Sequence, residues 1–527
     1  MTRAVRASLV AVLLLFSGLA FEHPAAAQTL RVGVRSDFVI DPHFLFLGPN
    51  MAAARYLYDS FVDRDVDAHP APGLAQSWTL LDERTWEFKL RSGVLFHDGK
   101  PFTAEDVAFS IARIPTLPNN PGPYTANLRG IEKVEIVDPL TIRLHMDSPD
   151  PVIPGQMTNI FIVSSKAAQE ATSADFASGK AAIGTGPFKL VRFTQGEGME
   201  LDRFDQFWGK KPVWQHISIR IMPNNAARVA ALLAGDVDLI EDVPPEQVAT
   251  VRQSGAQVFA RPSDRVMYLL PNVGAEKLPL LTDVDGNPLD KNPMRDLRVR
   301  QAVSKAIDRK ALIEHVLYGE AVPDGQIVPE GFGGYDPAIK PEAYDPAAAK
   351  QLLSEAGYPR GFGLTIACTN DRYVNDAQIC QALAQMLSRV GLAAKVQTMP
   401  GSVFFGAVKN GKNLMPLILY GSSSGSTRDA THVLSLVLHS NDPKRDFGQS
   451  NRGDFRDANL DRLIEEAAFG LGPDREQKLS IAMAEGIRLL AAIPLYNQMT
   501  IAAARKGIDF TPRMDEQLVA TYAVPAP

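Results

Sequence analysis

The segment 421–425, GSSSG, has residue types and a spacing that could support nucleophilic catalysis. It fits the G-x-S-x-G pattern, in which a serine on a tight turn between a strand and a helix attacks an acyl carbon. The apolar run 414–420 precedes it, and His432 and His439 follow it as candidate bases. The sequence has no HGGG-type segment upstream that could form the oxyanion loop. Serine hydrolysis is therefore an alternative interpretation rather than the main one.

Metal and nucleotide sites have weaker support. The histidines fall in unrelated segments without an H-E-x-x-H spacing. The glycine-rich segment 184–190, GTGPFKL, lacks the G-x-x-x-x-G-K-[ST] pattern of a phosphate loop. Its Pro187 also removes a backbone N–H group that a phosphate would need. We therefore predict neither a metal ion nor a cofactor.

Candidate binding residues lie in three other places. Arg372 and Tyr373 precede a predicted helix, where they could meet a ligand carboxylate and an apolar portion of the ligand respectively. The alternative for Arg372 is a solvated loop residue. Phe44 and the pair Phe404-Phe405 are candidate pocket walls, with packing in a hydrophobic core as the alternative.

Composition and charge limit the class of protein. The chain has 527 residues, which exceeds one ordinary hydrophobic core and predicts two or three lobes. Apolar residues make up 45% and charged residues 22%, as in globular proteins. The net charge of −6 disfavours a nucleic-acid partner, which would require a basic face.

The N-terminus has the pattern of a secretory signal. Arg3 and Arg6 precede the short apolar run 9–21, and the segment 24–27, PAAA, supplies small residues for cleavage after Ala27. The apolar run is shorter than the ~20 residues that span a bilayer. We therefore expect residues 1–27 to be removed and the protein to be released into the periplasm.

Cys368 and Cys380 are the two cysteines of the chain, and both lie in the exported part. An oxidising compartment permits a disulfide between them. The sequence does not give the distance between their Cα atoms, so a bridge and two free thiols both remain open.

The segment 75–113 predicts a strand, a tight turn and a helix. Trp86 and Phe88 alternate with polar residues, which is the period of a strand with one buried face, and we expect this strand to continue to Phe96. The turn HDGKP follows. Thr103 can then cap the free N–H groups of a helix whose first turn is acidic.

This segment carries a resemblance to a known family. Its pattern W-x-x-x-D-x-x-T-W-x-F-x-L-R-x-G-V-x-F-H-D-G-x-P-F-T-A-E-D-V-x-F-S resembles the signature of family 5 extracytoplasmic solute-binding proteins, which serve ABC importers of peptides, opines and nickel. Further similarities lie in 184–190, in the L-x-x-G-x-x-D pattern of 232–238 and in 296–309, DLRVRQAVSKAIDR. Together they extend over nearly the whole exported chain.

The resemblance implies an α/β fold: a periplasmic-binding-protein-like clamshell of two lobes, with a third, smaller lobe attached to the first. We name these lobe I, lobe II and the accessory lobe. The implied ranges are 1–27 for the signal peptide, 28–60 with 184–270 and 492–527 for lobe I, 61–183 for the accessory lobe and 271–491 for lobe II.

The resemblance also implies the function. The protein would be a monomer and not an enzyme; it would enclose a small-molecule or peptide-like ligand between two lobes and deliver it to an ABC permease at the inner membrane. A periplasmic chaperone or other interaction protein is an alternative, and it would not close around a small ligand.

Peptide binders of the family hold the ligand's α-amino group with an aspartate in a W-x-x-D segment. Here Tyr420 replaces the tryptophan, and Ser423 stands where the aspartate is expected. Because a buried ammonium without a carboxylate is costly, this difference disfavours a free amine. It favours a neutral or acidic polar ligand, such as a modified peptide, an opine-like or a sugar-like compound. Asp429 could still reach in if the loop is shifted. The predicted ligand-binding residues are Phe44, Arg372, Tyr373, Phe404, Tyr420, Ser422, Ser423, Ser424 and Asp429.

Overall fold

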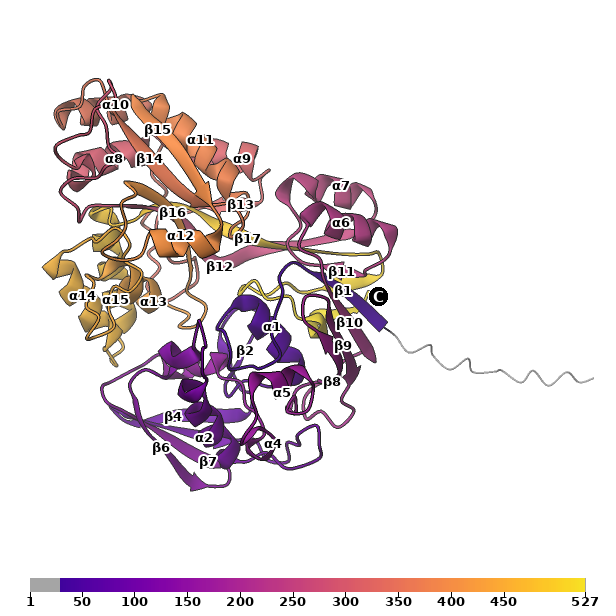
Figure 1. The fold of residues 1–527 in the computed structure, drawn as a ribbon. Coiled ribbons are helices and arrows are strands. Elements are labelled where there is room, and N and C mark those ends of the chain that lie inside the picture. Colours follow the sequence, from indigo (N-terminus) through magenta and orange to yellow (C-terminus); the bar gives the residue numbers. More distant parts are fainter. Residues whose placement is uncertain (1–28, 527) are drawn as a thin grey trace, which may run out of the picture.

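The computed structural model describes residues 29–526, so the predicted signal peptide and its cleavage site lie outside the described residues. The chain forms an upper lobe, a second lobe at the right and a third below them (Figure 1). We keep the names lobe II, lobe I and accessory lobe for these parts and retain the ranges above as our proposed boundaries. Within 29–526, no helix is long and apolar enough to cross a membrane.

One mixed sheet runs through lobes I and II. Its strands lie in the order β15-β14-β16-β12-β17-β11-β1-β10-β9-β8, and β13 pairs with β17 at the side. The bounds are β1 (Thr29–Val34), β8 (Phe188–Thr194), β9 (Gly198–Arg203), β10 (His216–Ile221), β11 (Leu239–Ile240), β12 (Gln257–Pro271), β13 (Ala321–Pro323), β14 (Phe362–Thr369), β15 (Leu392–Met399), β16 (Leu417–Ser423) and β17 (Ile493–Ala504).

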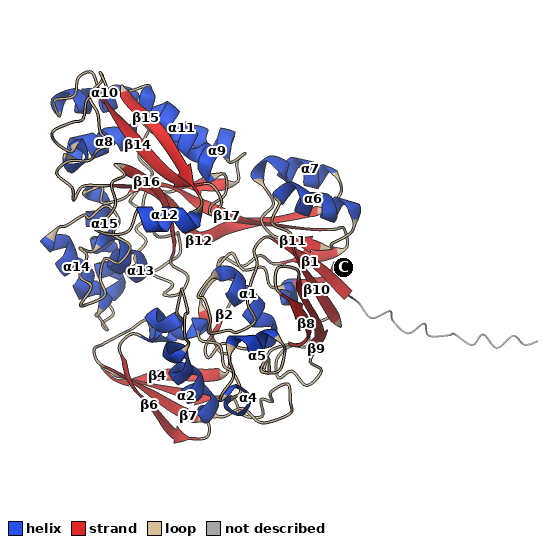
Figure 2. Ribbon diagram, viewed as in Figure 1, coloured by secondary structure: helices blue, strands red, loops and turns tan. Residues whose placement is uncertain are grey.

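The antiparallel strands β12 and β17 connect the lobes. They are 15 and 12 residues long, and they run from the upper lobe to the right-hand lobe (Figure 2). At one end of the pair, Gln257 lies opposite Ala504 and Pro262 opposite Met499; pairing resumes at Val266 opposite Asn497 and continues towards lobe II. The run 266–270 is buried on both faces, which explains its continuous apolar sequence.

The helices of lobe II flank its part of the sheet, and those of lobe I pack beside its shorter strands (Figure 2). Two hydrophobic core clusters lie mainly in lobe II, one lies within lobe I, and one is shared by lobe I and the accessory lobe. The lobe II helices are α8 (Leu297–Lys305), α9 (Arg309–Val316), α10 (Pro346–Glu355), α11 (Asp376–Ser388), α12 (Gly401–Ala407), α13 (Thr431–Val433), α14 (Ala458–Ala468) and α15 (Arg475–Arg488); those of lobe I are α1 (Gly48–Leu57), α6 (Asn225–Ala234) and α7 (Val248–Gln253).

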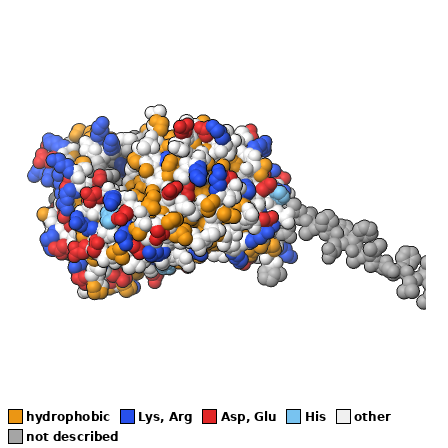
Figure 3. Space-filling view, turned by 90° about the horizontal axis from the view of Figure 1, so that it is seen from below, with side chains coloured by type: hydrophobic (Ala, Val, Ile, Leu, Met, Phe, Trp, Pro, Cys, Tyr) orange, Lys and Arg blue, Asp and Glu red, His pale blue; other side chains and the backbone are white. Residues whose placement is uncertain are grey.

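The accessory lobe contains a four-stranded antiparallel sheet in the order β4-β5-β7-β6. On the face seen in Figure 3, Lys and Arg side chains are interspersed with Asp and Glu. The elements of this lobe are β4 (Ala75–Asp82), β5 (Thr85–Leu90), β6 (Ile131–Asp138), β7 (Thr141–Met146), α2 (Ala104–Arg113), α3 (Ile153–Gln156), α4 (Ser165–Ala168) and α5 (Ser173–Ala177). In the same lobe, β2 (Asp63–Arg64) pairs with β3 (Pro70–Ala71). Near the C-terminus, in lobe I, β18 (Ile508–Phe510) pairs with β19 (Ala523–Pro525).

The local prediction for 75–113 is confirmed at the helix and corrected at the strand. The helix α2 begins after Thr103 as predicted, and the backbone N–H of Thr103 donates to the carboxylate of Asp106 at 3.0 Å in a capping-box arrangement. The strand ends at Leu90, not Phe96. Gly93 adopts a φ of 75°, which turns the chain out of the ladder. Phe96 is still buried, because its ring lies in the hydrophobic core beside that of Phe102.

The helix predicted for 51–62 is shorter than expected. It begins at Gly48 and ends at Leu57. Tyr58 adopts an extended conformation, and Ser60 then forms a bridge with Phe161 of the accessory lobe. The aromatic residues after Leu57 therefore belong to the junction of two lobes rather than to a helical face.

A disulfide joins Cys368 to Cys380, with a Cα–Cα distance of 6.6 Å. Cys368 lies on β14, and Cys380 lies in the second turn of α11. The bridge therefore closes the connection between a central strand and the helix that follows it. That connection contains Arg372 and Tyr373.

Removing this cross-link should lower stability. We expect Cys368→Ala/Cys380→Ala to reduce the free energy of unfolding by about 3 kcal/mol, because a short closed loop restricts the unfolded chain. Urea unfolding monitored by circular dichroism measures the change, and the reduced wild-type protein is the control. Equal unfolding midpoints for oxidised wild type and variant would contradict the expectation.

Candidate ligand-binding site

The end of β16 meets the start of α11 through one tyrosine. The hydroxyl of Tyr373 donates to the carbonyl oxygen of Gly421 at 3.3 Å and accepts from its N–H group at 3.2 Å. Burial raises the pKa of Tyr373 to about 12, so this hydroxyl stays protonated. The structure thus brings the segments containing Arg372 and Tyr420 together, although the sequence separates them widely.

The three consecutive serines make different contacts. The hydroxyl of Ser422 lies 2.5 Å from that of Tyr268 on β12. Ser423 donates to the carboxylate of Asp264, also at 2.5 Å. Ser424 is fully buried, and its hydroxyl has no hydrogen-bond partner within the described chain.

Asp264 belongs to an irregular part of β12. The three residues 263–265 are not paired with β17. The side-chain amide of Asn497 on β17 replaces the missing ladder bonds, because it donates to the carbonyl oxygens of Ser263 and Arg265 at 2.9 and 2.8 Å. Such an interruption bends a strand and redirects its side chains.

Arg265 on the same bulge pairs with the C-terminal segment of lobe I. Its guanidinium donates to both carboxylate oxygens of Glu516, at 2.8 to 3.1 Å. Burial alone would raise the pKa of Glu516, but the charge and hydrogen bonds of Arg265 lower it. A buried bidentate pair therefore links the strand that crosses between the lobes to residues 513–518.

Arg372 is a cation without an ion-pair partner among residues 29–526. The residue is exposed, and its guanidinium lies 5.5 Å from the centroid of the Tyr373 ring. The surrounding protein displaces enough water to lower the pKa of Arg372, and the nearby charge of Arg265 lowers it further. Such a group is well suited to bind an anion.

Lobe I contributes a further charged cluster near this site. The backbone N–H of Arg35 donates to Glu241 at 2.7 Å, and its guanidinium pairs with Asp242 at 3.3 Å. Asp242, Glu241 and Glu516 of lobe I and, across the lobes, Asp376 raise the pKa of Arg35. Burial, with the neighbouring charge of Asp242, raises the pKa of Glu241 to about 7.

Two predicted residues are engaged inside lobe II. Asp429 pairs with Arg475 at 2.7 Å and accepts from the backbone of Thr431, so its carboxylate is fully used within the lobe. Phe404 has no exposed surface and packs in the lobe II core. The neighbouring Phe405 is the residue that reaches Tyr420, with ring centroids 6.2 Å apart.

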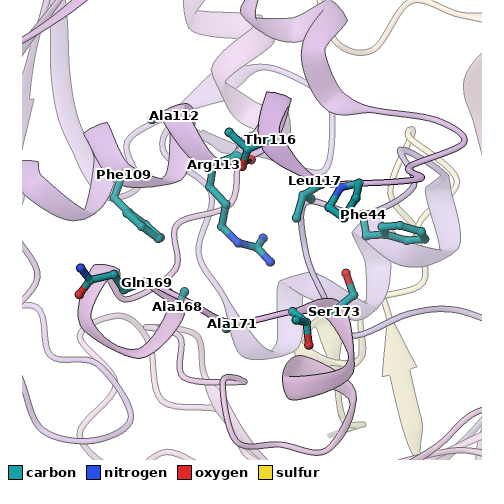
Figure 4. Close-up of a pocket in the computed structure, with 12 residues that line it drawn as sticks. Phe44, Phe109, Ala112, Arg113, Thr116, Leu117, Ala168, Gln169, Ala171 and Ser173 are labelled. Carbon is teal, nitrogen blue, oxygen red and sulfur yellow. Dashed lines mark hydrogen bonds between the residues drawn. The ribbon is translucent and has the colours of Figure 1, made fainter.

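Phe44 lies at a separate pocket of about 480 Å³ between α2, α4 and α5. Figure 4 shows Phe44 at one end and Arg113 pointing from α2 towards Ser173. The guanidinium of Arg113 is paired with the buried carboxylate of Asp41 at 2.7 Å. The structure therefore does not group Phe44 with Arg372 and the serines.

A second cavity, of about 420 Å³, lies between the accessory lobe and lobe II, where it extends along the loop that follows β16. The two lobes touch at its edges. Arg129 donates to the carbonyl oxygen of Asp446 at 3.1 Å, and a Cβ atom on Gly155 would come within 2.4 Å of the carbonyl oxygen of Ser426. The polar lining includes Thr125, Asn127, Gln156, Ser426, Thr427 and His432.

The geometry of a nucleophile elbow is absent from the described residues. Ser423 donates to Asp264 and not to a histidine. His432 lies on the short helix α13 and lines the cavity between the accessory lobe and lobe II. The chain after Ser423 forms turns until Thr431 rather than entering a helix at once.

Sequence reasoning missed Asp264, Arg265 and Glu516. One signal was available: the pair Asp264-Arg265 directly precedes the strongly apolar run 266–270. Charged residues next to such a buried strand require partners. Which partners they find depends on the tertiary fold, because Glu516 lies 251 residues from Arg265.

Two α/β lobes joined by long shared strands, with polar and charged groups converging where they cross, define a two-lobed solute-binding protein. The family model for the middle region of bacterial extracellular solute-binding proteins, family 5, matches residues 69–444, and the chain belongs to this family. It is therefore a solute-binding component of an ABC import system and not an enzyme.

Individual relatives agree with this assignment. The glutathione-binding protein GsiB of Salmonella paratyphi A is 28% identical over 447 residues, which are 84% of this chain and 83% of GsiB. The structure of CtaP from Listeria monocytogenes has a TM-score of 0.81, 20% identity and coverage of 94% and 99%. AgaA of A. tumefaciens R10 with agropinic acid has a TM-score of 0.74, 23% identity and coverage of 95% and 99%. The two structural matches show that the fold is shared.

The loop after β16 should tolerate no side chain at position 425. A Cβ atom on Gly425 would lie 2.0 Å from a carboxylate oxygen of Asp264, whereas one on Gly406 of α12 would meet nothing within 4 Å. We expect Gly425→Ala to destabilise the protein by about 1–3 kcal/mol, as overpacking does, and Gly406→Ala to have no such effect. Thermal unfolding of both variants measures this. Equal melting temperatures for the two variants would contradict it.

Proposed function

We propose that this protein binds a small, acidic, peptide-like solute between its lobes and presents it to an ABC permease at the inner membrane. The observation that carries the proposal is Arg372, whose exposed guanidinium has no anionic partner among the described residues and whose neighbour Tyr373 bonds to Gly421 at the serine-lined end of β16. A ligand carboxylate would supply that partner.

The comparisons support this ligand class. Glutathione, which GsiB is named for, carries carboxylates, and AgaA was solved with an acid. The cavity of about 420 Å³ beside the β16 loop falls within the usual range for small-ligand sites, so there is room for part of an extended ligand. Tyr420 and Phe405 offer apolar surface next to the polar groups.

Binding would act through closure of the lobes. A ligand that contacts both lobes only in the closed form stabilises that form and shifts the population towards it. Micromolar affinity corresponds to about −8 kcal/mol, which a few charged hydrogen bonds and buried contacts can supply. We further propose that the exported protein is a periplasmic monomer that begins after Ala27, which N-terminal sequencing and light scattering would test.

Replacing Arg372 should weaken ligand binding selectively. With glutathione as the first probe, followed by acidic dipeptides and opines, we expect Arg372→Ala to raise Kd about 10- to 100-fold, because a charged hydrogen bond contributes about 1.5–3 kcal/mol. Isothermal titration calorimetry measures this. Arg389→Ala removes the same charge at the other end of α11 and is the matched control.

Two results would overturn the proposal. One is the absence of any ligand-induced thermal shift or closure, followed by small-angle scattering, across this set of probes; that result would favour the chaperone or interaction protein. The other is an Arg372→Ala variant that binds as tightly as Arg389→Ala.

A further inference from the structure

Specific hydrogen bonds hold the bulge at residues 263–265 in its conformation. Asn497 satisfies two of its carbonyl groups from β17, and the hydroxyl of Ser263 accepts from the backbone of Arg265 at 3.1 Å. The bulge lies between the two paired parts of β12, the strand that connects the lobes. Bulges at such positions redirect side chains towards a site, and this one directs Asp264 towards the end of β16.

The carboxylate of Asp264 is buried and only half satisfied. Asp264 is 1% exposed; one of its oxygens accepts from Ser423, and the other has no hydrogen-bond partner within the described chain. Buried carboxylate oxygens without partners are rare because desolvation is costly. The unpartnered oxygen therefore indicates a binding partner that this chain does not itself provide.

The nearby cations are already committed to other groups. Arg265 is held by Glu516 through both carboxylate oxygens. The guanidinium of Arg64 donates to Thr158 and Asn159. Five charged groups interact electrostatically with Asp264. They are Arg265 on β12, Asp515 and Glu516 on the C-terminal segment, Arg64 on β2 and Arg428 on the loop after β16.

The loop after β16 is shaped around this carboxylate. Ser423 supplies the hydroxyl that orients it, the backbone N–H of Ser424 donates to the carbonyl oxygen of Asp264 at 3.2 Å, and Gly425 leaves the space that its oxygen occupies. Position 423 is where the resemblance places the amine-binding aspartate of peptide binders. A carboxylate is therefore present at this place, but it comes from β12.

We propose that Asp264 is the ammonium anchor of the ligand site, held in position by Ser423, and that the ligand carries a free amine as well as a carboxylate. This inference rests on the proposed function, and it narrows the ligand class from acidic to zwitterionic. The ammonium group of the ligand would donate to the unpartnered oxygen of Asp264 and neutralise its charge.

The pH dependence of binding follows from the state of this carboxyl group. Burial, followed by the charge of Glu516, raises the pKa of Asp264 to about 7 in the unliganded protein. The carboxyl group is therefore largely protonated at pH 5.5 and must ionise to bind an ammonium. Affinity for a free-amine ligand should rise about 10-fold or more between pH 5.5 and pH 8, since the ionised fraction of a carboxyl group with a pKa of about 7 rises by more than about tenfold over that interval.

The decisive experiment compares glutathione with N-acetylglutathione, whose amine is blocked, by isothermal titration calorimetry on the mature protein. We expect the wild type to prefer glutathione by at least about 10-fold, and Asp264→Asn to lose this preference mainly through weaker glutathione binding. If another probe from the acidic set binds more tightly, it and its acetylated form are used instead.

Two further variants keep the test sharp. Asp59→Asn is the matched control. Burial also raises the pKa of Asp59 to about 7, but the hydrogen bonds of its carboxylate go to Trp208 and Thr185, both within lobe I. Asp264→Ser/Ser423→Asp moves the carboxylate to the other strand and should restore the preference for the free amine, even if Asp264→Asn folds poorly.

The outcomes separate the two proposals. If no acidic probe binds, the proposed function fails. If glutathione binds but Asp264→Asn and the exchanged variant keep the wild-type ratio of the two affinities, or if the wild type binds the acetylated probe equally well, the role of Asp264 is wrong while the proposed function stands.

Discussion

The pairing of β12 with β17 is the constraint on which the rest of this structure depends. Both strands belong to a single sheet that passes through lobes I and II, so each lobe is completed by the same two segments. A change in the angle between the lobes must be absorbed within these strands, because there is no flexible linker in their place. The regular pairing of the two strands is interrupted at residues 263–265, where Asn497 bonds to the carbonyl groups of Ser263 and Arg265. The interruption of the strand pairing and the polar groups of the candidate site therefore coincide.

This coincidence explains the unusual electrostatics. Arg265 and Glu516 form a closed pair across the crossing, whereas Arg372 and one oxygen of Asp264 are left without partners. The oxygen of Asp264 is buried, so leaving it without a partner costs free energy in the unliganded protein, whereas the guanidinium of Arg372 is exposed to water. On our proposals, a solute with two opposite charges would supply a partner to both groups at once. The same contacts, those of the solute with Arg372 and Asp264, would then both recognise the solute and stabilise the closed form.

Much of the fold could be predicted because its determinants are local. The alternation in 85–90, the Thr103–Asp106 capping box and the run before Ser423 depend on neighbours in sequence. The ends of elements were less predictable, since Tyr58 leaves its helix to meet another lobe. The site was harder still. Phe404 and Phe405 are indistinguishable by type, and only packing decides which ring is buried. Asp264 and Glu516 acquire their partners from distant segments, so no local pattern identified them.

The position of the disulfide has a consequence for the maturation of the protein. Cys368 and Cys380 bracket the turn that carries Arg372 and Tyr373. Once the bridge forms, this turn has fewer conformations available, so less entropy remains to be lost when a solute arrives. The oxidising environment reached after export would thus order the turn that carries Arg372 before a solute binds. Protein kept in the reducing cytoplasm would lack the bridge and bind the solute more weakly.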